Sequence, residues 1–176
     1  MKRISLLLTG ILIALNVSAQ DAKLPAVSVK TLTGKSISAA DFSNDGKPFV
    51  ICFWATWCKP CLTELNTMAE YYEEWQNETG VKIYAVSIDD IRTSKKVLPL
   101  VKSSEWDYEV ILDENSELKR AMGVNNPPHT FLCNGKGEIV WQHASYALGD
   151  EQNLINVIRK LIAEGDLQNK ATATPK

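Results

Sequence analysis

Cys58 and Cys61 are the residues whose type and spacing most clearly indicate chemistry. They are separated by two residues within the segment FWATWCKPCLTEL, residues 53–65. Such a pair can supply half of a metal site, form a structural disulfide or act as a redox pair. A disulfide between them would close a very short loop, and such a loop stabilises a fold little through chain entropy. The spacing therefore favours a redox role.

The residues around the pair place it where a buried strand passes into a helix. An apolar run precedes Cys58, and apolar residues at helical spacing follow Lys59. The N-terminus of a helix favours an anion such as a thiolate, and Lys59 adds a positive charge there. Pro60 suits the first helical turn, where its missing N–H costs nothing. We predict that Cys58 is the exposed nucleophile and that Cys61, one turn further on, is the more buried resolving thiol.

The two remaining cysteines, Cys52 and Cys133, lie in apolar strand-like runs, where free cysteine behaves as a small hydrophobe. A disulfide between them across neighbouring strands is the alternative. A structural zinc site would need two more ligands beside the C-x-x-C pair, and the two histidines lack the paired spacing of zinc ligands: His129 and His143. We expect no metal and no cofactor beyond the redox-active disulfide itself.

The elements that must position the pair follow from hydrophobic periodicity and turn residues. Strands are expected at 48–55, 81–88 and 108–113, with hairpins over 24–42 and 129–143. Helices are expected at 59–79, 92–105, 114–123 and 149–165. We expect Gly80 to end the first helix, Asp150 to cap the last and Gly165 to end it. This order predicts an α/β fold with a mixed central sheet flanked by helices.

The first residues have the plan of a secretory signal peptide. Lys2 and Arg3 precede the uncharged apolar stretch ISLLLTGILIAL, and small residues then lead to a cleavage site after Ala19. The alternative is a retained membrane anchor. We predict a signal peptide at 1–19, one domain at 20–165 and a flexible tail at 166–176, in a periplasmic or secreted protein. The formal net charge of −2 gives no reason to expect nucleic-acid binding or a membrane surface.

Four segments in order resemble the thioredoxin superfamily, most of all its exported TlpA/ResA-like disulfide reductases. They are FWATWCKPC, VSIDD, MGVNNPPHTF and NGKGEIV, and the resemblance runs from about Leu24 to Ile162. It implies a thioredoxin-like fold with an N-terminal β-hairpin extension and thiol–disulfide exchange through the disulfide Cys58–Cys61. It also implies exported thiol or disulfide proteins as substrates, such as apocytochromes, and a membrane partner as electron donor.

The resemblance assigns further residues around the pair. It implies that Pro128 is a cis-proline packed against Cys58, whereas the alternative is a trans Pro-Pro turn before a strand. Pro127 departs from the family pattern because it has no N–H to offer an extended substrate. Trp57 is expected to form a groove wall, and the substrate groove then includes these residues: Trp57, Lys59, Pro60, Pro127 and Pro128.

Glu64 follows Cys61 by three residues, so both share a helix face. A glutamate matches this position in the ResA-like group, which implies that Glu64 accepts the proton of Cys61. Partial burial is expected to raise the pKa of Glu64 towards a range useful for that role. The alternative is an acidic residue that complements the N-terminus of the helix. Cys52 matches the position where many thioredoxins bury an acidic residue, which leaves Glu64 as the better candidate for the acceptor.

The predicted function is a periplasmic protein disulfide reductase. One alternative is a peroxiredoxin-like peroxidase, although FWATWC lacks the proline that precedes a peroxidatic cysteine in that class. Another is a non-catalytic binding module with the same fold, against which the intact pair of Cys58 and Cys61 argues.

Overall fold

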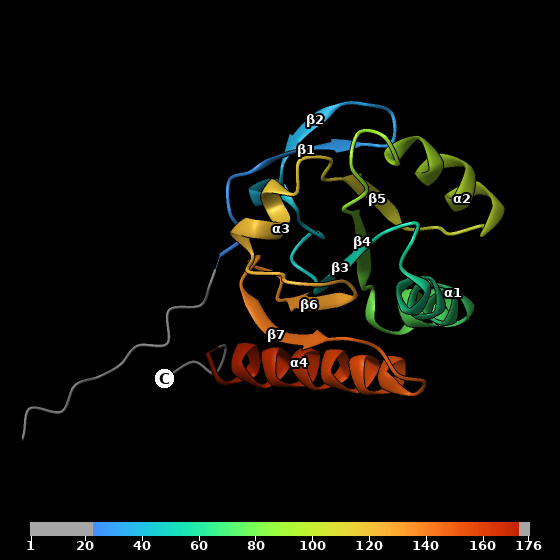
Figure 1. Cartoon of the computed structure of the whole chain (residues 1–176). Helices are drawn as coiled ribbons and strands as arrows, with labels where there is room; N and C mark the ends of the chain where they lie inside the picture. Colours follow the sequence, from blue (N-terminus) through green and yellow to red (C-terminus); the bar gives the residue numbers. More distant parts are fainter. Residues whose placement is uncertain (1–22, 173–176) are drawn as a thin grey trace, which may run out of the picture.

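The computed structural model describes residues 23–172, and the side chains of residues 23–165. A mixed seven-stranded sheet forms its centre, in the order β2-β1-β5-β4-β3-β6-β7 (Figure 1). The strands are β1 (Ser28–Thr31), β2 (Ser36–Ser38), β3 (Phe49–Trp54), β4 (Lys82–Ser87), β5 (Glu109–Leu112), β6 (His129–Cys133) and β7 (Ile139–Ala144). The predicted α/β class, the mixed sheet and the N-terminal hairpin of β1 and β2 are confirmed.

The apolar run of β3 places this strand in the middle of the sheet. Every side chain of β3 is buried, as expected for a strand that is covered on both faces. It pairs in parallel with β4 and antiparallel with β6, and β6 pairs antiparallel with β7. The carboxyl ends of β3 and β4 therefore meet the start of β6 and the end of β7 at one edge of the sheet.

Three α-helices and two short 3₁₀ turns lie between the strands, and a fourth α-helix follows the last strand. The helices are α1 (Lys59–Thr79), α2 (Val97–Ser103), α3 (Glu117–Ala121) and α4 (Asp150–Thr172), and the 3₁₀ turns are Ala39–Asp41 and Ser94–Lys96. Figure 1 shows α4 running along β7 with α1 beside it, whereas α2 and α3 lie toward β5 and β1. Pro99 falls in the first turn of α2, where a helix tolerates proline.

Helix α1 begins and ends where the sequence predicts. Cys58 is its N-cap, and Gly80 is its C-cap in the left-handed region, with φ of 66°. Glycine adopts this conformation without the steric cost of a β-carbon, so the chain can turn directly from α1 into β4. The inward face of α1 packs on the core through these residues: Leu65, Met68, Tyr72 and Trp75.

Two predictions about α4 are wrong. The helix does not end at Gly165 but continues to Thr172, because glycine lowers helix propensity without preventing a helix. Asp150 is the first residue of the helix and not its cap; its carboxylate accepts from the backbone N–H of Ala147 at 2.7 Å. The predicted signal peptide lies outside the described residues, as does the end of the predicted tail.

Candidate active site

Cys58 and Cys61 form a disulfide at the N-terminus of α1, with their Cα atoms 5.3 Å apart. The Sγ atom of Cys58 accepts a hydrogen bond from the backbone N–H of Cys61 at 3.3 Å, so the sulfur caps the helix. Cys58 is 5% exposed and Cys61 is fully buried. The predicted order of exposure is confirmed, but Cys58 is less exposed than expected because its sulfur lies against the first helical turn.

A buried carboxylate fixes the loop that leads from β3 to Cys58. Asp89 accepts from the backbone N–H of Thr56 at 2.8 Å and from its hydroxyl at 2.6 Å. Ser87, the last residue of β4, donates to the same carboxylate at 2.9 Å. Three hydrogen bonds offset the cost of burying this charge. Asp89 therefore ties the loop before the disulfide to the neighbouring parallel strand.

The peptide bond between Pro127 and Pro128 is cis, as the family resemblance implies. Phe53 pairs with His129 in the β3–β6 register, so Pro128 lies next to the end of β3 at the edge that carries the disulfide. Pro128 is buried, and its carbonyl accepts from the backbone N–H of Ser145 at 2.9 Å. Pro127 has no N–H, so its carbonyl is the only backbone hydrogen-bonding group that it can offer.

Three exposed large apolar side chains follow strands that end at this edge of the sheet, and one of them is Leu148 after β7, which is 81% exposed. Trp57 precedes the disulfide and is 63% exposed, and Ile91 follows β4 and is 78% exposed. Lys59 and Pro60 occupy the exposed first turn of α1 beside Trp57. Trp57 and Ile91 follow the carboxyl ends of the adjacent parallel strands β3 and β4, and we call these two residues the apolar rim.

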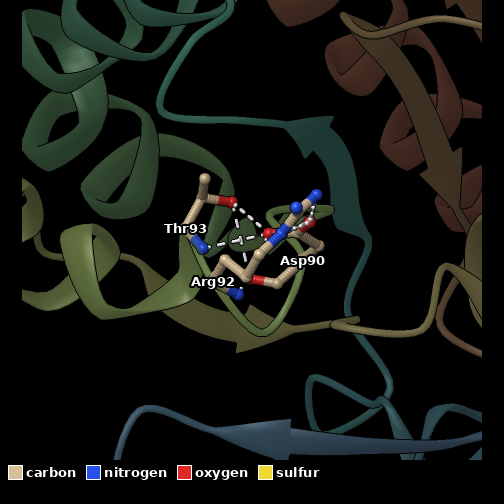
Figure 2. Close-up of polar contacts among 3 residues, drawn as sticks. All are labelled: Asp90, Arg92 and Thr93. Carbon is tan, nitrogen blue, oxygen red and sulfur yellow. Dashed lines mark hydrogen bonds and ion pairs between the residues drawn. The ribbon is translucent and has the colours of Figure 1, made fainter.

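The turn that carries Ile91 is fixed by Asp90 (Figure 2). Its carboxylate accepts from the backbone N–H groups of Arg92 and Thr93, each at 3.0 Å, and from the Thr93 hydroxyl at 3.0 Å. The Arg92 guanidinium also donates to it at 3.0 and 3.1 Å. These hydrogen bonds, that of Arg92 first, lower the pKa of Asp90 to about 2. The turn is therefore charged at one side and apolar at its tip.

Glu64 is buried, with only 6% of its surface exposed. Its Oε1 accepts a hydrogen bond from the hydroxyl of Thr130 in β6 at 2.7 Å. Burial raises the pKa of Glu64 to about 7, against the opposing effect of the Thr130 hydrogen bond, and the nearby Asp150 raises it further. The expected rise in the pKa of Glu64 is confirmed, but the acid is more deeply buried than expected, because α1 turns it toward the sheet, where it contacts Thr130.

Cys52 and Cys133 are both free and buried, so the alternative of a disulfide between them is wrong. The β3–β6 register explains this, because Cys52 pairs with Thr130 whereas Cys133 pairs with Phe49. Successive side chains of a strand point to opposite faces, and Phe49 and Cys52 are an odd number of residues apart. The two sulfurs therefore lie on opposite faces of the sheet.

Asp89 and Thr130 are the residues of this site to which the sequence assigned no role. Both stand in segments that carried the family resemblance, VSIDD and PPHTF. The apolar strand before Asp89 indicates a strand end, and strand ends of a parallel pair gather at one edge. No comparable local signal marks Thr130, because its partner on α1 is 66 residues away.

Comparisons with known proteins agree with this geometry. The model of the AhpC/TSA family matches residues 20–142. The chain belongs to the AhpC/TSA family. Thiol-disulfide oxidoreductase ResA from Bacillus thuringiensis is 35% identical over 116 residues, which are 66% of this chain and 64% of that protein. The chain thus spans just under two thirds of the length of this relative.

Two further relatives connect this AhpC/TSA member to thioredoxin-like proteins. Sporulation thiol-disulfide oxidoreductase A from Bacillus subtilis is 30% identical over 124 residues, 68% of this chain and 73% of that protein. A solution structure of an uncharacterized thioredoxin-like protein from Porphyromonas gingivalis is 48% identical, with a TM-score of 0.74 over 81% of this chain and 93% of that one. The predicted resemblance to ResA-like thioredoxins and the thioredoxin-like fold are confirmed.

Within residues 23–172, the helices are too short or too polar for any of them to cross a membrane.

Proposed function

We propose that this AhpC/TSA protein is a thiol–disulfide oxidoreductase that works as a protein disulfide reductase. The observation that carries the proposal is the disulfide at the N-terminus of α1, with a buried acid one turn further along the same helix. A helix N-terminus stabilises a thiolate, and a C-x-x-C pair exchanges disulfides through a mixed intermediate. The names of the ResA and sporulation relatives support the same chemistry.

The reaction begins from the reduced pair and takes place in two exchange steps. The Cys58 thiolate attacks one sulfur of a substrate disulfide, forming a mixed disulfide and releasing the other substrate sulfur as a thiolate. The Cys61 thiolate then attacks Cys58 Sγ, which restores the Cys58–Cys61 disulfide and releases the second substrate thiolate. The substrate gains two electrons and the protein loses two, so an external dithiol donor must reduce the pair again.

Glu64 is proposed as the acceptor of the Cys61 proton. The two residues share a face of α1, three positions apart, and both are buried. A carboxyl group with a pKa near 7 holds and releases a proton close to neutral pH, which suits a general base. The competing role as a complement of the helix dipole requires an ionised carboxylate, and the burial that raises the pKa of Glu64 favours the protonated form instead.

The substrate is proposed to lie across the apolar rim and the Pro127–Pro128 segment. Trp57 and Ile91 supply exposed apolar surface after the carboxyl ends of β3 and β4, and Lys59 and Pro60 complete the exposed first turn of α1. An extended peptide beside Pro127 could donate to its carbonyl but could not accept from it. Recognition would then depend more on apolar contact than on backbone pairing.

The proposed setting is the periplasm or another exported location, with reducing equivalents from a membrane partner. The basic start and apolar stretch of residues 1–19 support export. The resemblance to ResA-like reductases supports exported thiol or disulfide proteins as substrates, apocytochromes among them. Cytochrome c maturation is the cellular role that follows from this proposal.

Trapping of the mixed disulfide tests the reaction. The Cys61→Ser variant, reduced and mixed with insulin, should accumulate a covalent adduct on Cys58, because the resolving thiol is missing. Cys58→Ser should form none and should lose insulin reduction. Cys133→Ser is the matched control and should turn over normally. Peroxide consumption without insulin reduction would identify a peroxidase instead, and loss of neither activity in Cys58→Ser would refute the proposal.

A further inference from the structure

Three buried side chains from three elements meet under the active site: Cys52 of β3, Thr130 of β6 and Glu64 of α1. Cys52 and Thr130 are direct partners in the β3–β6 register, so their side chains share one face of the sheet. Thr130 Oγ1 lies 2.7 Å from Glu64 Oε1 and 3.7 Å from Cys52 Sγ. One hydroxyl group therefore touches both an acid and a thiol that are shielded from water.

We propose that this cluster is a hydrogen-bonded chain that positions the carboxyl group of Glu64 for its exchange of a proton with Cys61. The Thr130 hydroxyl is placed to donate either to Glu64 Oε1 or to Cys52 Sγ. While Glu64 is ionised, the hydroxyl donates to Glu64 Oε1 and the Cys52 thiol donates to Thr130 Oγ1. Thr130 and Cys52 are thus positioning residues that act through Glu64. This inference rests on the proposed function, in which Glu64 accepts the proton of Cys61.

The number of available hydrogens sets the direction of these hydrogen bonds while Glu64 is ionised. A hydroxyl group has one hydrogen, and an ionised carboxylate can only accept. The Thr130 hydrogen therefore goes to Glu64, and the lone pairs of Thr130 Oγ1 are left to accept from Cys52. Burial raises the pKa of Cys52, so this sulfur keeps its hydrogen at neutral pH. Hydrogen bonds in such a chain strengthen one another.

The same hydrogen-bonded cluster also accommodates Glu64 in its protonated form. When Glu64 has taken a proton it can donate to Thr130 Oγ1, and the hydroxyl hydrogen can then turn toward Cys52 Sγ. The same three heavy atoms remain in contact in both states, so little has to move when the proton arrives. A rotating hydroxyl beside the acid therefore offers a partner before and after proton transfer.

Other ionisable groups also interact electrostatically with Glu64. These groups come from β3, the segment before β5, the loop after β7 and α4: Cys52, Tyr108, Tyr146 and Asp150. His143 of β7 lies 3.3 Å from the Asp150 carboxylate. Thr130 is not ionisable, and its hydroxyl donates directly to Glu64.

Substitutions at Thr130 test the first link. Thr130→Val keeps the shape but removes the donor, so the ionised form of Glu64 loses support. The midpoint of Glu64 should rise by about one pH unit, with about tenfold slower release of the mixed disulfide near pH 6. Thr130→Ser should restore both. Thr79→Val is the matched control, because the Thr79 hydroxyl donates to Trp75 within the far end of α1.

Substitutions at Cys52 test the second link. Cys52→Ser introduces a stronger donor and should lower the titration midpoint of Glu64, whereas Cys52→Ala removes the donor and should raise it. Each shift should change the rate of release of the mixed disulfide on the order of twofold near pH 6. Cys133→Ala is the matched control, since Cys133 is an equally buried thiol on the other face of the sheet. Equal or same-direction shifts in the two Cys52 variants would exclude Cys52 from the chain.

Two readouts separate this inference from the proposed function. Carboxyl carbon NMR of the oxidised protein follows the titration of Glu64 without any exchange reaction, and stopped-flow kinetics follows release of the mixed disulfide. An unmoved Glu64 titration in Thr130→Val would overturn the chain even if Glu64→Gln slows release. Unaltered release in Glu64→Gln would overturn the proton-acceptor role instead, and with it the functional meaning of the chain. If Thr130→Val does not fold, the opposite shifts expected of the two Cys52 variants still decide the matter.

Discussion

The two ends of helix α1 carry glutamates whose pKa values are shifted in opposite directions. Near the N-terminus, Glu64 is buried against the sheet, and burial raises its pKa to about 7. Near the C-terminus, Glu78 stands in solvent and accepts from the Arg159 guanidinium at 2.6 and 2.7 Å, which lowers its pKa. One helix thus supports one acid that can exchange a proton near neutral pH and one that stays ionised.

The difference shows what burial does when the partner is neutral. Glu64 loses water and gains one hydroxyl donor, so the net effect favours its protonated form. Glu78 keeps water and gains a cation, so its charged form is favoured. Both residues are glutamates of the same helix. Their pKa values differ because Glu64 is buried against Thr130 of the sheet, whereas Glu78 is exposed and contacts Arg159 of α4.

The largest expected effect is on the pH dependence of stability in the oxidised protein. The folded pKa of Glu64 lies above its unfolded value, so its contribution is fully present below about pH 4.5 and is lost as pH rises through about 7. The stability difference between wild type and Glu64→Gln should change by up to about 3 kcal/mol across this window. Urea unfolding at several pH values measures it, with Glu78→Gln as the control. Parallel curves for wild type and Glu64→Gln would contradict the burial of this acid.

The next effect is kinetic. Glu64→Gln should leave the first attack by Cys58 nearly unchanged but slow the release of the mixed disulfide by about 10²-fold near neutral pH, at the low end of general-base assistance. Stopped-flow separation of the two exchange steps measures this. Glu78→Gln should leave both steps at the wild-type rate, because its carboxylate lies at the far end of the helix. An unchanged release rate in Glu64→Gln would remove the contrast between the two acids.

The smallest effect is expected at the exposed pair. Glu78→Gln should lower stability only slightly at neutral pH, because solvent and salt screen an ion pair at the surface. The lowered pKa of Glu78 means that this small contribution is present above its unfolded pKa and is lost as pH falls through the folded one. Thermal unfolding in low and high salt measures it. A large, salt-independent loss would show that the pair is more than a surface contact.

Local sequence signals were sufficient for the elements and for the reactive pair. The uninterrupted apolar run of β3 predicts a central strand, and Gly80 marks the end of α1. The C-x-x-C spacing at a strand-to-helix junction points to Cys58 and Cys61 without any tertiary information. The cis bond before Pro128 followed from the family resemblance and not from the local pattern.

The surroundings of Glu64 could not be predicted in the same way. Its burial depends on the packing of α1 against the sheet and α4, and its partner Thr130 depends on the register between β3 and β6. A shift of that register by one residue would turn Thr130 to the other face. The continuation of α4 past Gly165 was missed for a different reason, since a single glycine only weakens a helix.

Cys58 is at once the cap of α1 and one half of the reactive bond, so folding and electron transfer share a closed thermodynamic cycle. Whatever the helix contributes to the thiolate in the folded chain must reappear as a higher reduction potential than that of the unfolded chain. For a two-electron couple, a difference of about 30 mV in reduction potential corresponds to about 1.4 kcal/mol of free energy. The difference between the unfolding free energies of the reduced and oxidised protein therefore gives the difference between the reduction potentials of the folded and unfolded chains.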